Sequence, residues 1–427
     1  NITAIDEGAL SAFGKVSVIE IPENVAEIGN NALPLGDYKI RGYKNSEAER
    51  YASDNGKNFV LKGLRVLSVG NSHTYDYTRW IGNIQNDLYA AGLKTEINHE
   101  YIVAGGRQLY RNDGTALSHL TIGSDPSKPG NFEYINMLGS GKKWDLVILQ
   151  DWHESSLDNE NFAEGLGNAV KWVKSLQPNA KIVWAEDWAD KDSFRITSQT
   201  SLEGVFSNIT AAMNAVEAMS ENKPDAIFPM GTAVQNARTS YLGAVNNAKD
   251  AYTNLADTDW AQSNLQDYTV LERDLTHLSH ELGRYTVGAA VYAGIYSMFE
   301  NNLDKPASFD FYNALKTAPV TSGAAEWKGE FNDSIWSIVK ESARNAYIMK
   351  NGVTNSVYTV DPADEAASAM KNANYSAVDF SDKNAIAVAA SNSSGLKIEA
   401  EDIVVSGNTA QITFLLGYTK KTVDISK

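Results

Sequence analysis

Short apolar runs alternate with helix-length amphipathic segments through the middle of the chain. Runs rich in apolar and β-branched residues predict buried strands at residues 64–69, 95–103, 145–150, 181–185 and 226–229. Apolar residues recur at helical spacing in residues 77–91, 160–176, 202–219 and 284–300. Alternating strands and helices are typical of a parallel sheet covered on both faces. The pattern therefore predicts an α/β fold, a three-layer α/β/α sandwich with a flavodoxin-like parallel sheet.

The first 62 residues follow a different, repetitive pattern. Residues 2–10 (ITAIDEGAL) align with residues 25–33 (VAEIGNNAL), and strand-like residues 16–22 lie between them. A period in this range is typical of leucine-rich repeats, which bury their apolar edges by stacking on one another. The segment resembles the repeats of bacterial surface proteins, and chance similarity is the alternative. We expect these 62 residues to be the remnant and cap of a longer array of leucine-rich repeats.

A third pattern begins near residue 351, where β-type stretches at 403–405, 410–416 and 422–425 are separated by turn residues. The sequence thus predicts three parts. They are a leucine-rich-repeat remnant (1–62), an α/β domain (63–350) and a small β-rich module (351–427).

Composition narrows the choice of partners. The chain has 37 Lys and Arg residues against 53 Asp and Glu, a formal net charge of -16, so its surface would repel a phosphate backbone. It has no cysteine, which removes disulfides, thiolate metal sites and a cysteine nucleophile from consideration. The longest apolar run, residues 287–299, is shorter than the roughly 18 residues a membrane span needs. We expect a secreted or cell-surface bacterial protein that binds no nucleic acid, with flanking regions as a means of attachment.

Candidate catalytic residues follow the predicted strands, where open parallel sheets bind their ligands. Ser72 follows the first strand and Gln150 ends the third, and in the strand order 2-1-3-4-5 these strands are neighbours. A serine nucleophile needs a base, and Asp274-Leu-Thr-His277 could supply His277 with Asp274 as its orienting carboxylate. The alternative for Ser72 is a helix N-cap. The backbone N–H groups of Ser72 and Gly106 and the Gln150 amide are the candidate oxyanion donors.

These residues resemble the SGNH hydrolases, also called GDSL-like esterases, in the branch whose first block reads Gly-Asn-Ser. The resemblance covers about residues 64–301 and rests on Gly70-Asn71-Ser72, Gly105-Gly106 and Asp274 to His277. The family's usual Gly-x-Asn-Asp block is missing, and VILQDWHES stands in its place, similar to the Gln-containing variant of carbohydrate acetylesterases. The resemblance implies ester hydrolysis through a covalent acyl-Ser72, with acylated carbohydrates as substrates.

Polar and aromatic residues after the strands are candidates for binding such a substrate. We expect His73, Trp152, His153 and Trp188 at the rim of the site, with ordinary packing as the alternative for the tryptophans. A divalent metal held by the NSH and QDWHES segments is a weaker alternative, because their spacing fits no known ligand motif. We therefore expect neither metal nor cofactor.

The sequence predicts a serine esterase that hydrolyses O-acyl, foremost O-acetyl, groups of carbohydrates or other small esters. One alternative is a noncatalytic, glycan-binding adhesion protein on the same scaffold. Another is an acyltransferase that passes the acyl group from the same acyl-enzyme to a sugar.

Overall fold

The computed structural model divides into two compact units, Asn1–Tyr347 and Ile348–Lys427. The residues that it describes are 2–103, 138, 141–151, 159–190, 192–195, 202–238, 271–272, 276–279, 282–315, 342–344, 346, 399–406, 409–416 and 419–426. The second unit is described only as an antiparallel sheet of β10 (Glu399–Ser406), β11 (Thr409–Leu416) and β12 (Thr419–Ser426).

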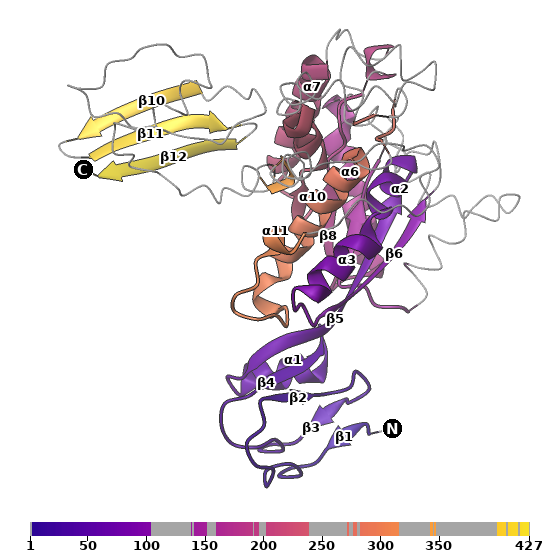
Figure 1. Cartoon of the computed structure of the whole chain (residues 1–427), viewed down its shortest axis with the longest axis vertical. Coiled ribbons are helices and arrows are strands. Elements are labelled where there is room, and N and C mark those ends of the chain that lie inside the picture. The colour runs from indigo at the N-terminus through magenta and orange to yellow at the C-terminus, as the bar shows by residue number, and fades with distance from the viewer. Residues whose placement is uncertain are drawn as a thin grey trace, which may run out of the picture. The chain divides into compact units, whose positions relative to one another are not determined.

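A seven-stranded parallel sheet forms the centre of the first unit (Figure 1). Its strands are β2 (Val18–Glu20), β4 (Lys39–Tyr43), β5 (Asn58–Gly70), β6 (Glu96–Val103), β7 (Leu146–Leu149), β8 (Lys181–Ala185) and β9 (Ala226–Phe228). The order β6-β5-β7-β8-β9 is the flavodoxin-like order 2-1-3-4-5 that the sequence predicts. All four residues of β7 are buried, as expected for a parallel strand with helices on both faces.

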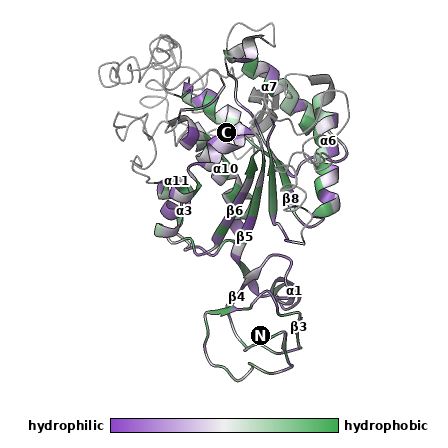
Figure 2. Cartoon of the chain, turned by 90° about the vertical axis from the view of Figure 1, so that its right-hand side faces the viewer, coloured by the Kyte–Doolittle hydropathy of each residue, from purple (hydrophilic) through white to green (hydrophobic). Residues whose placement is uncertain are grey.

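Helices cover both faces of this sheet (Figure 2). On one side lie α2 (Ser72–Thr78), α3 (Ile81–Ala90), α10 (Leu282–Phe299) and α11 (Phe311–Ala314), and on the other α6 (Asn159–Leu176) and α7 (Leu202–Glu217). There are also two short 3-10 helices, η3 (Asp192–Arg195) and η5 (Glu300–Asn302), and residues 230–238 and 342–344 are helical as well. The predicted α/β/α sandwich is therefore confirmed. No helix within the described residues is long and apolar enough to cross a membrane.

The helix predicted at residues 77–91 is confirmed as α3, but its predicted start at residue 77 is wrong. The chain instead forms α2 and α3, which are separated at Arg79 and Trp80. Trp80 is 5% exposed and packs its ring edge-on against Tyr285 of α10, with centroids 5.3 Å apart. This large ring is therefore buried against α10 at the break between the two helices.

The N-terminal segment joins the α/β sheet through a shared strand. β1 (Ala4–Ile5) pairs in parallel with β3 (Glu27–Ile28), so the two copies of the sequence repeat lie side by side. β5 crosses the boundary expected at residue 62 without a break, pairing with β4 through its first half and with β6 and β7 through its second. α1 (Glu47–Asp54) packs on β4 and β5. The leucine-rich-repeat assignment and the domain boundaries stay predictions.

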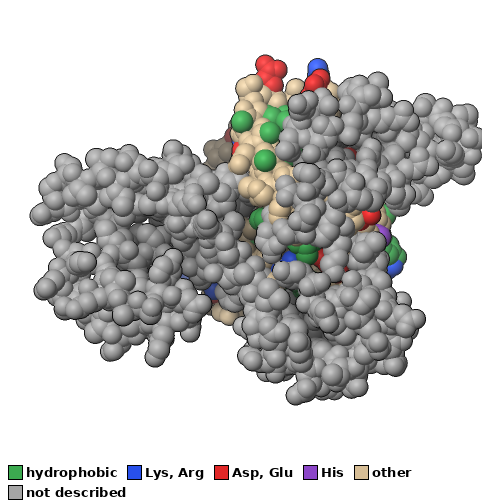
Figure 3. Space-filling view, turned by 90° about the horizontal axis from the view of Figure 1, so that it is seen from above, with side chains coloured by type: hydrophobic (Ala, Val, Ile, Leu, Met, Phe, Trp, Pro, Cys, Tyr) green, Lys and Arg blue, Asp and Glu red, His purple; other side chains and the backbone are tan. Residues whose placement is uncertain are grey.

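Charged side chains of both signs reach the described surface of the molecule. On the described part of the face in Figure 3, basic side chains are interspersed with acidic ones.

We predict opposite stability effects for the same substitution at two helical glycines. A Cβ at Gly294 of α10 would lie 2.5 Å from the ring of Phe228, whereas a Cβ at Gly82 of α3 meets nothing within 4 Å. Gly294→Ala should therefore destabilise the fold by about 1–3 kcal/mol through overpacking. Gly82→Ala should stabilise it by about 0.4–1 kcal/mol by restricting the unfolded chain. Urea unfolding measures both, and equal effects at the two positions would contradict the packing of α10 on β9.

Candidate active site

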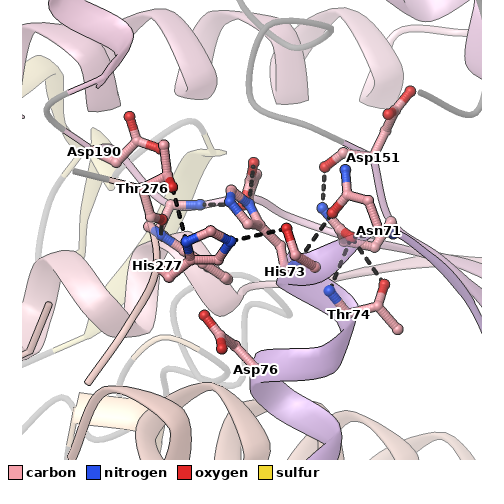
Figure 4. Close-up of polar contacts among 12 residues, drawn as sticks. Asn71, His73, Thr74, Asp76, Asp151, Asp190, Thr276 and His277 are labelled. Atoms are coloured by element: carbon pink, nitrogen blue, oxygen red, sulfur yellow. Dashed lines mark hydrogen bonds and ion pairs between the residues drawn. The ribbon is translucent and has the colours of Figure 1, made fainter. Parts of the chain in front are cut away.

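Ser72 begins helix α2, two residues after β5 ends at Gly70. The N-cap of this helix is Asn71, whose side chain accepts a hydrogen bond of 3.0 Å from the N–H of His73. The alternative in which Ser72 is the N-cap is therefore wrong. Asn71, His73 and Thr74, which Figure 4 labels, are buried, whereas Ser72 is half-buried and is the most exposed of these four residues.

Gln150 ties the end of β7 to the first turn of α2. Its Oε1 accepts from the N–H of Thr74 at 3.1 Å and from the Thr74 hydroxyl at 2.8 Å, and its amide nitrogen donates to the Asp151 carbonyl. Gly70 permits this approach, because a Cβ there would lie 2.2 Å from Thr74 Oγ1 and 2.6 Å from the Gln150 carbonyl oxygen. The structure thus brings Ser72 and Gln150 to neighbouring positions at the switch point of the sheet.

His277 faces Ser72 from a segment 205 residues further along the chain. Its Nε2 lies 2.9 Å from Ser72 Oγ, and its Nδ1 lies 3.0 Å from Thr276 Oγ1. When Nδ1 carries the proton and donates it to Thr276 Oγ1, the Nε2 lone pair is directed at the Ser72 hydroxyl. This is the arrangement in which a histidine accepts a proton from a serine nucleophile.

Asp76 connects the two segments that carry Ser72 and His277. It lies on α2, one helical turn after Ser72, and is fully buried. Its Oδ2 accepts from the N–H of Leu278 at 3.0 Å, and its Oδ1 accepts from Arg284 Nε at 2.8 Å. The neighbour of His277 in the chain is therefore hydrogen-bonded directly to the helix of Ser72.

A second histidine–carboxylate contact lies beside the first. His73 is 1% exposed, and its Nδ1 lies 2.9 Å and 3.1 Å from the two oxygens of Asp187, which follows β8. Burial alone would lower the pKa of His73, but the charge of Asp187 and its hydrogen bond outweigh burial and raise that pKa to about 9. His73 is therefore an imidazolium at neutral pH. Its ring meets that of His277 edge-on, with centroids 5.5 Å apart.

Trp188 is fully buried next to this pair. Its ring stacks on His73 with centroids 4.4 Å apart and planes at 25°, and its Nε1 donates to the Thr276 carbonyl at 3.0 Å. These contacts match the packing alternative for Trp188. His73 is likewise buried, and its described contacts are with Asp187, Trp188 and His277. The described contacts therefore do not place His73 at the rim of the site.

Four other predicted site residues lie outside the described residues: Gly106, Trp152, His153 and Asp274. Of the predicted residues that the structure describes, Ser72, Gln150 and His277 come together at one edge of the sheet, with His73 and Trp188 behind them. Their catalytic and binding roles stay predictions.

Buried acids crowd the segment after β8. Glu186, Asp187 and Asp190 are all fully buried. Burial raises the pKa of Asp190 well above its usual range, which favours its neutral form. In the described part of the chain, no group of three or more His, Asp and Glu side chains is arranged to hold a metal ion.

A second serine–histidine contact lies in the core. Ser68 Oγ is 2.7 Å from His99 Nε2, and His99 Nδ1 is 3.1 Å from the hydroxyl of Tyr292. Ser68 is fully buried within β5, so a substrate cannot reach it. Desolvation lowers the pKa of His99 to about 3, which keeps the ring neutral. Of the two serines that contact a histidine, only Ser72 is therefore accessible to a substrate in the described structure.

The sequence interpretation missed three contributors. Asp76 carries no signal in the sequence beyond its place on a helix, and Thr276 stands between Asp274 and His277 with no signal of its own. Asp187 lies in a segment with two other acids, Glu186 and Asp190, and the sequence does not distinguish the three. Their partners follow from the tertiary structure.

The chain matches no protein-family model and no curated protein. Among solved structures it is similar to a DUF4886 family protein from Bacteroides uniformis, with 18% identity, a TM-score of 0.45, and coverage of 67% of this chain and 95% of that chain. It is also similar to the lipase/acylhydrolase from Enterococcus faecalis, with 15% identity, a TM-score of 0.32, and coverage of 57% and 100%. A third match is a protein from Parabacteroides merdae assigned as a GDSL-like lipase, with 13% identity, a TM-score of 0.31, and coverage of 57% and 97%. Such low scores carry neither fold nor function to this chain.

We predict that the His73–Asp187 pair makes stability fall as the pH rises above 6.5. The pKa of His73 is about 9 in the folded protein and near 6.5 in the unfolded chain, so the pair stabilises fully below pH 6.5. Between pH 6.5 and 9 the unfolded chain loses this proton first, and the free energy of unfolding falls by up to about 1 kcal/mol per pH unit. Urea unfolding across this range measures the slope. His73→Gln should flatten it, and an unchanged slope in that variant would exclude the assignment.

We also predict that Asp76→Ala destabilises the fold by about 3 kcal/mol, because Arg284 stays buried without this carboxylate. Asp76→Ala combined with Arg284→Met should cost less than Asp76→Ala alone, since no buried charge remains. Urea unfolding of the two variants provides the comparison. A loss below 1 kcal/mol in the single variant contradicts the role of Asp76.

Proposed function

We propose that this chain is a serine ester hydrolase with Ser72 as its nucleophile and His277 as its general base. The observation that carries the proposal is the 2.9 Å contact between Ser72 Oγ and His277 Nε2. It occurs at the carboxyl edge of a parallel sheet, where such folds bind ligands, and at a half-buried hydroxyl. A serine hydroxyl is almost fully protonated near neutral pH and reacts only with a base in this position.

The reaction follows from these positions. His277 Nε2 takes the Ser72 proton as Oγ attacks the ester carbonyl, and a tetrahedral intermediate forms. His277 then protonates the departing alkoxide, which leaves an acyl group on Ser72. Water, deprotonated by the same histidine, attacks this ester and releases the acid, and the proton returns to Ser72.

The first turn of α2 supports one oxyanion donor. The side chains of Asn71 and Gln150 accept from the N–H groups of His73 and Thr74. The N–H of Ser72 has no acceptor among the described residues, so it can donate to a developing oxyanion. We propose the Gly106 N–H as a second donor. The Gln150 amide is a third, through the hydrogen that its bond to the Asp151 carbonyl does not use.

We propose Asp274 as the carboxylate that orients His277, with Thr276 holding Nδ1 in the described contacts. For the substrate we propose O-acyl esters of carbohydrates, foremost O-acetyl groups, and a secreted or cell-surface location. The resemblance of the Gln150 segment to carbohydrate acetylesterases supports this substrate class. Trp152 and His153, two residues of that segment, are the proposed contacts to the sugar.

We predict that a fluorophosphonate probe modifies the wild-type chain once, at Ser72. The base raises the nucleophilicity of this serine above that of the others, so one adduct should form. Intact-mass measurement followed by peptide mapping identifies the site. Ser72→Ala should lose the adduct, and His277→Gln should lower kcat with p-nitrophenyl acetate by roughly 10³-fold or more.

Ser68→Ala is the matched control, because it removes the other serine–histidine contact and should keep the adduct. With an acetylated polysaccharide, the wild type should release acetate and Ser72→Ala should not. An unmodified wild type, or an undiminished adduct on Ser72→Ala, would exclude the proposed hydrolase.

A further inference from the structure

We infer that Asp187 and Trp188 form a brace that sets the separation of Ser72 and His277. The inference rests on the proposed function and assigns positioning roles to Asp187, Trp188 and their partner His73. The brace is the pair of residues that follows β8 two positions after its last residue. It contacts the chain neighbour of each half of the proposed dyad, His73 beside Ser72 and Thr276 beside His277.

On the nucleophile side, the brace holds the residue next to Ser72. Both carboxylate oxygens of Asp187 lie within 3.1 Å of His73 Nδ1, and the Trp188 ring stacks on the same imidazole. The N–H of Trp188 also donates to Asp187 Oδ1 at 3.0 Å, which fixes the carboxylate. Asp187 thus holds the His73 ring by a hydrogen bond at its edge, and Trp188 holds it by stacking on its face.

On the base side, the brace holds the residue before His277. Trp188 Nε1 donates to the carbonyl of Thr276 at 3.0 Å, and the side chain of Thr276 contacts His277 Nδ1. The indole therefore reaches His277 through the backbone and through the Thr276 hydroxyl.

These contacts close a ring. It runs from Ser72 to His73, through Asp187 and Trp188 to Thr276 and His277, and back to Ser72 across the 2.9 Å contact. Every other link is a covalent bond, a hydrogen bond or a ring stack of a buried side chain. Misplacement of a catalytic group by about 1 Å can cost 10²-fold in rate, so a rigid ring has a direct kinetic effect.

The brace is itself anchored. The preceding residue, Glu186, accepts from the N–H of Thr232 at 2.8 Å and from its hydroxyl at 3.2 Å, and its own N–H donates to the Phe228 carbonyl at 2.9 Å. The guanidinium of Arg238 donates to the carbonyl of Ala189, the residue that follows. Contacts on both sides of the brace therefore fix its backbone.

Charge adds to the stiffness of the brace. Asp187 and His73 are both buried and lie at ion-pair distance, whereas burial favours the neutral form of nearby Asp190. Separating the pair would leave a buried charge on each side, which is strongly unfavourable. Among the described residues, Asp76 and His277 also lie near His73.

The test compares Trp188→Phe and Asp187→Asn with the wild type. Phe keeps a ring against His73 but cannot donate to Thr276, and Asn keeps an acceptor but loses the charge. We expect the rate of fluorophosphonate labelling at Ser72 and kcat with p-nitrophenyl acetate to fall about 10- to 100-fold in parallel. KM should stay within about threefold, because the ester does not contact the buried brace.

The matched control is Asp145→Asn at the opposite end of the sheet. Asp145 is also fully buried and pairs with Arg65 at 2.9 Å, so this variant removes a comparable charge. It should lower stability but leave the labelling rate within about twofold of the wild type. If Asp187→Asn does not fold, Trp188→Phe decides, since it keeps an aromatic ring and the Asp187 charge while removing the hydrogen bond to Thr276.

The outcomes separate the two proposals. A labelled wild type with wild-type labelling rates in the folded brace variants overturns the brace and leaves the hydrolase standing. Equal losses in Asp145→Asn and the brace variants also overturn it, because the effect is then general destabilisation. A wild type that is never labelled overturns the proposed function, and the brace with it.

Discussion

Two hydrogen bonds to the carboxylate of Asp76 hold the candidate site together. Ser72 and His277 come from segments 205 residues apart, and a 2.9 Å contact between them needs the segments fixed to a fraction of an ångström. Asp76 lies on the helix of Ser72 and accepts from the backbone N–H of Leu278, the residue after His277. Because this hydrogen bond is made to the backbone of Leu278, it fixes the path of the chain beside His277 whatever the rotamer of the Leu278 side chain. Arg284 then balances the buried charge.

Buried charges in this region are expensive, and their arrangement explains why they persist. The desolvation of an ion pair often cancels its Coulombic gain, so replacing such pairs by apolar residues can be neutral or stabilising. Here the two pairs Asp76–Arg284 and His73–Asp187 converge on the neighbours of Ser72 and His277. The hydrogen bonds within these two pairs are directional, so they restrict the positions of the side chains more closely than apolar packing does. If Ser72 and His277 act as proposed, positional accuracy at the site is the gain that offsets the cost of burying these charges.

Much of the α/β fold could be predicted from the sequence, because buried parallel strands read as apolar runs and the order of the sheet follows from general rules. The same rules placed Ser72 beside Gln150. The break at Trp80 was missed, because helical periodicity continues through it while the indole turns into the core. The roles of Asp76 and Asp187 could not be read from sequence, since chemically equal acids acquire different partners only in three dimensions.

The first turn of α2 shows how capping and chemistry combine at one helix end. A helix begins with backbone N–H groups that lack partners within the helix, and their partial positive charge favours an anion. Asn71 and Gln150 accept from two of these groups, at His73 and Thr74. The N–H that they do not take belongs to Ser72, whose hydroxyl faces His277. In the proposed mechanism, this remaining N–H would donate to the charge that a tetrahedral intermediate on Ser72 carries.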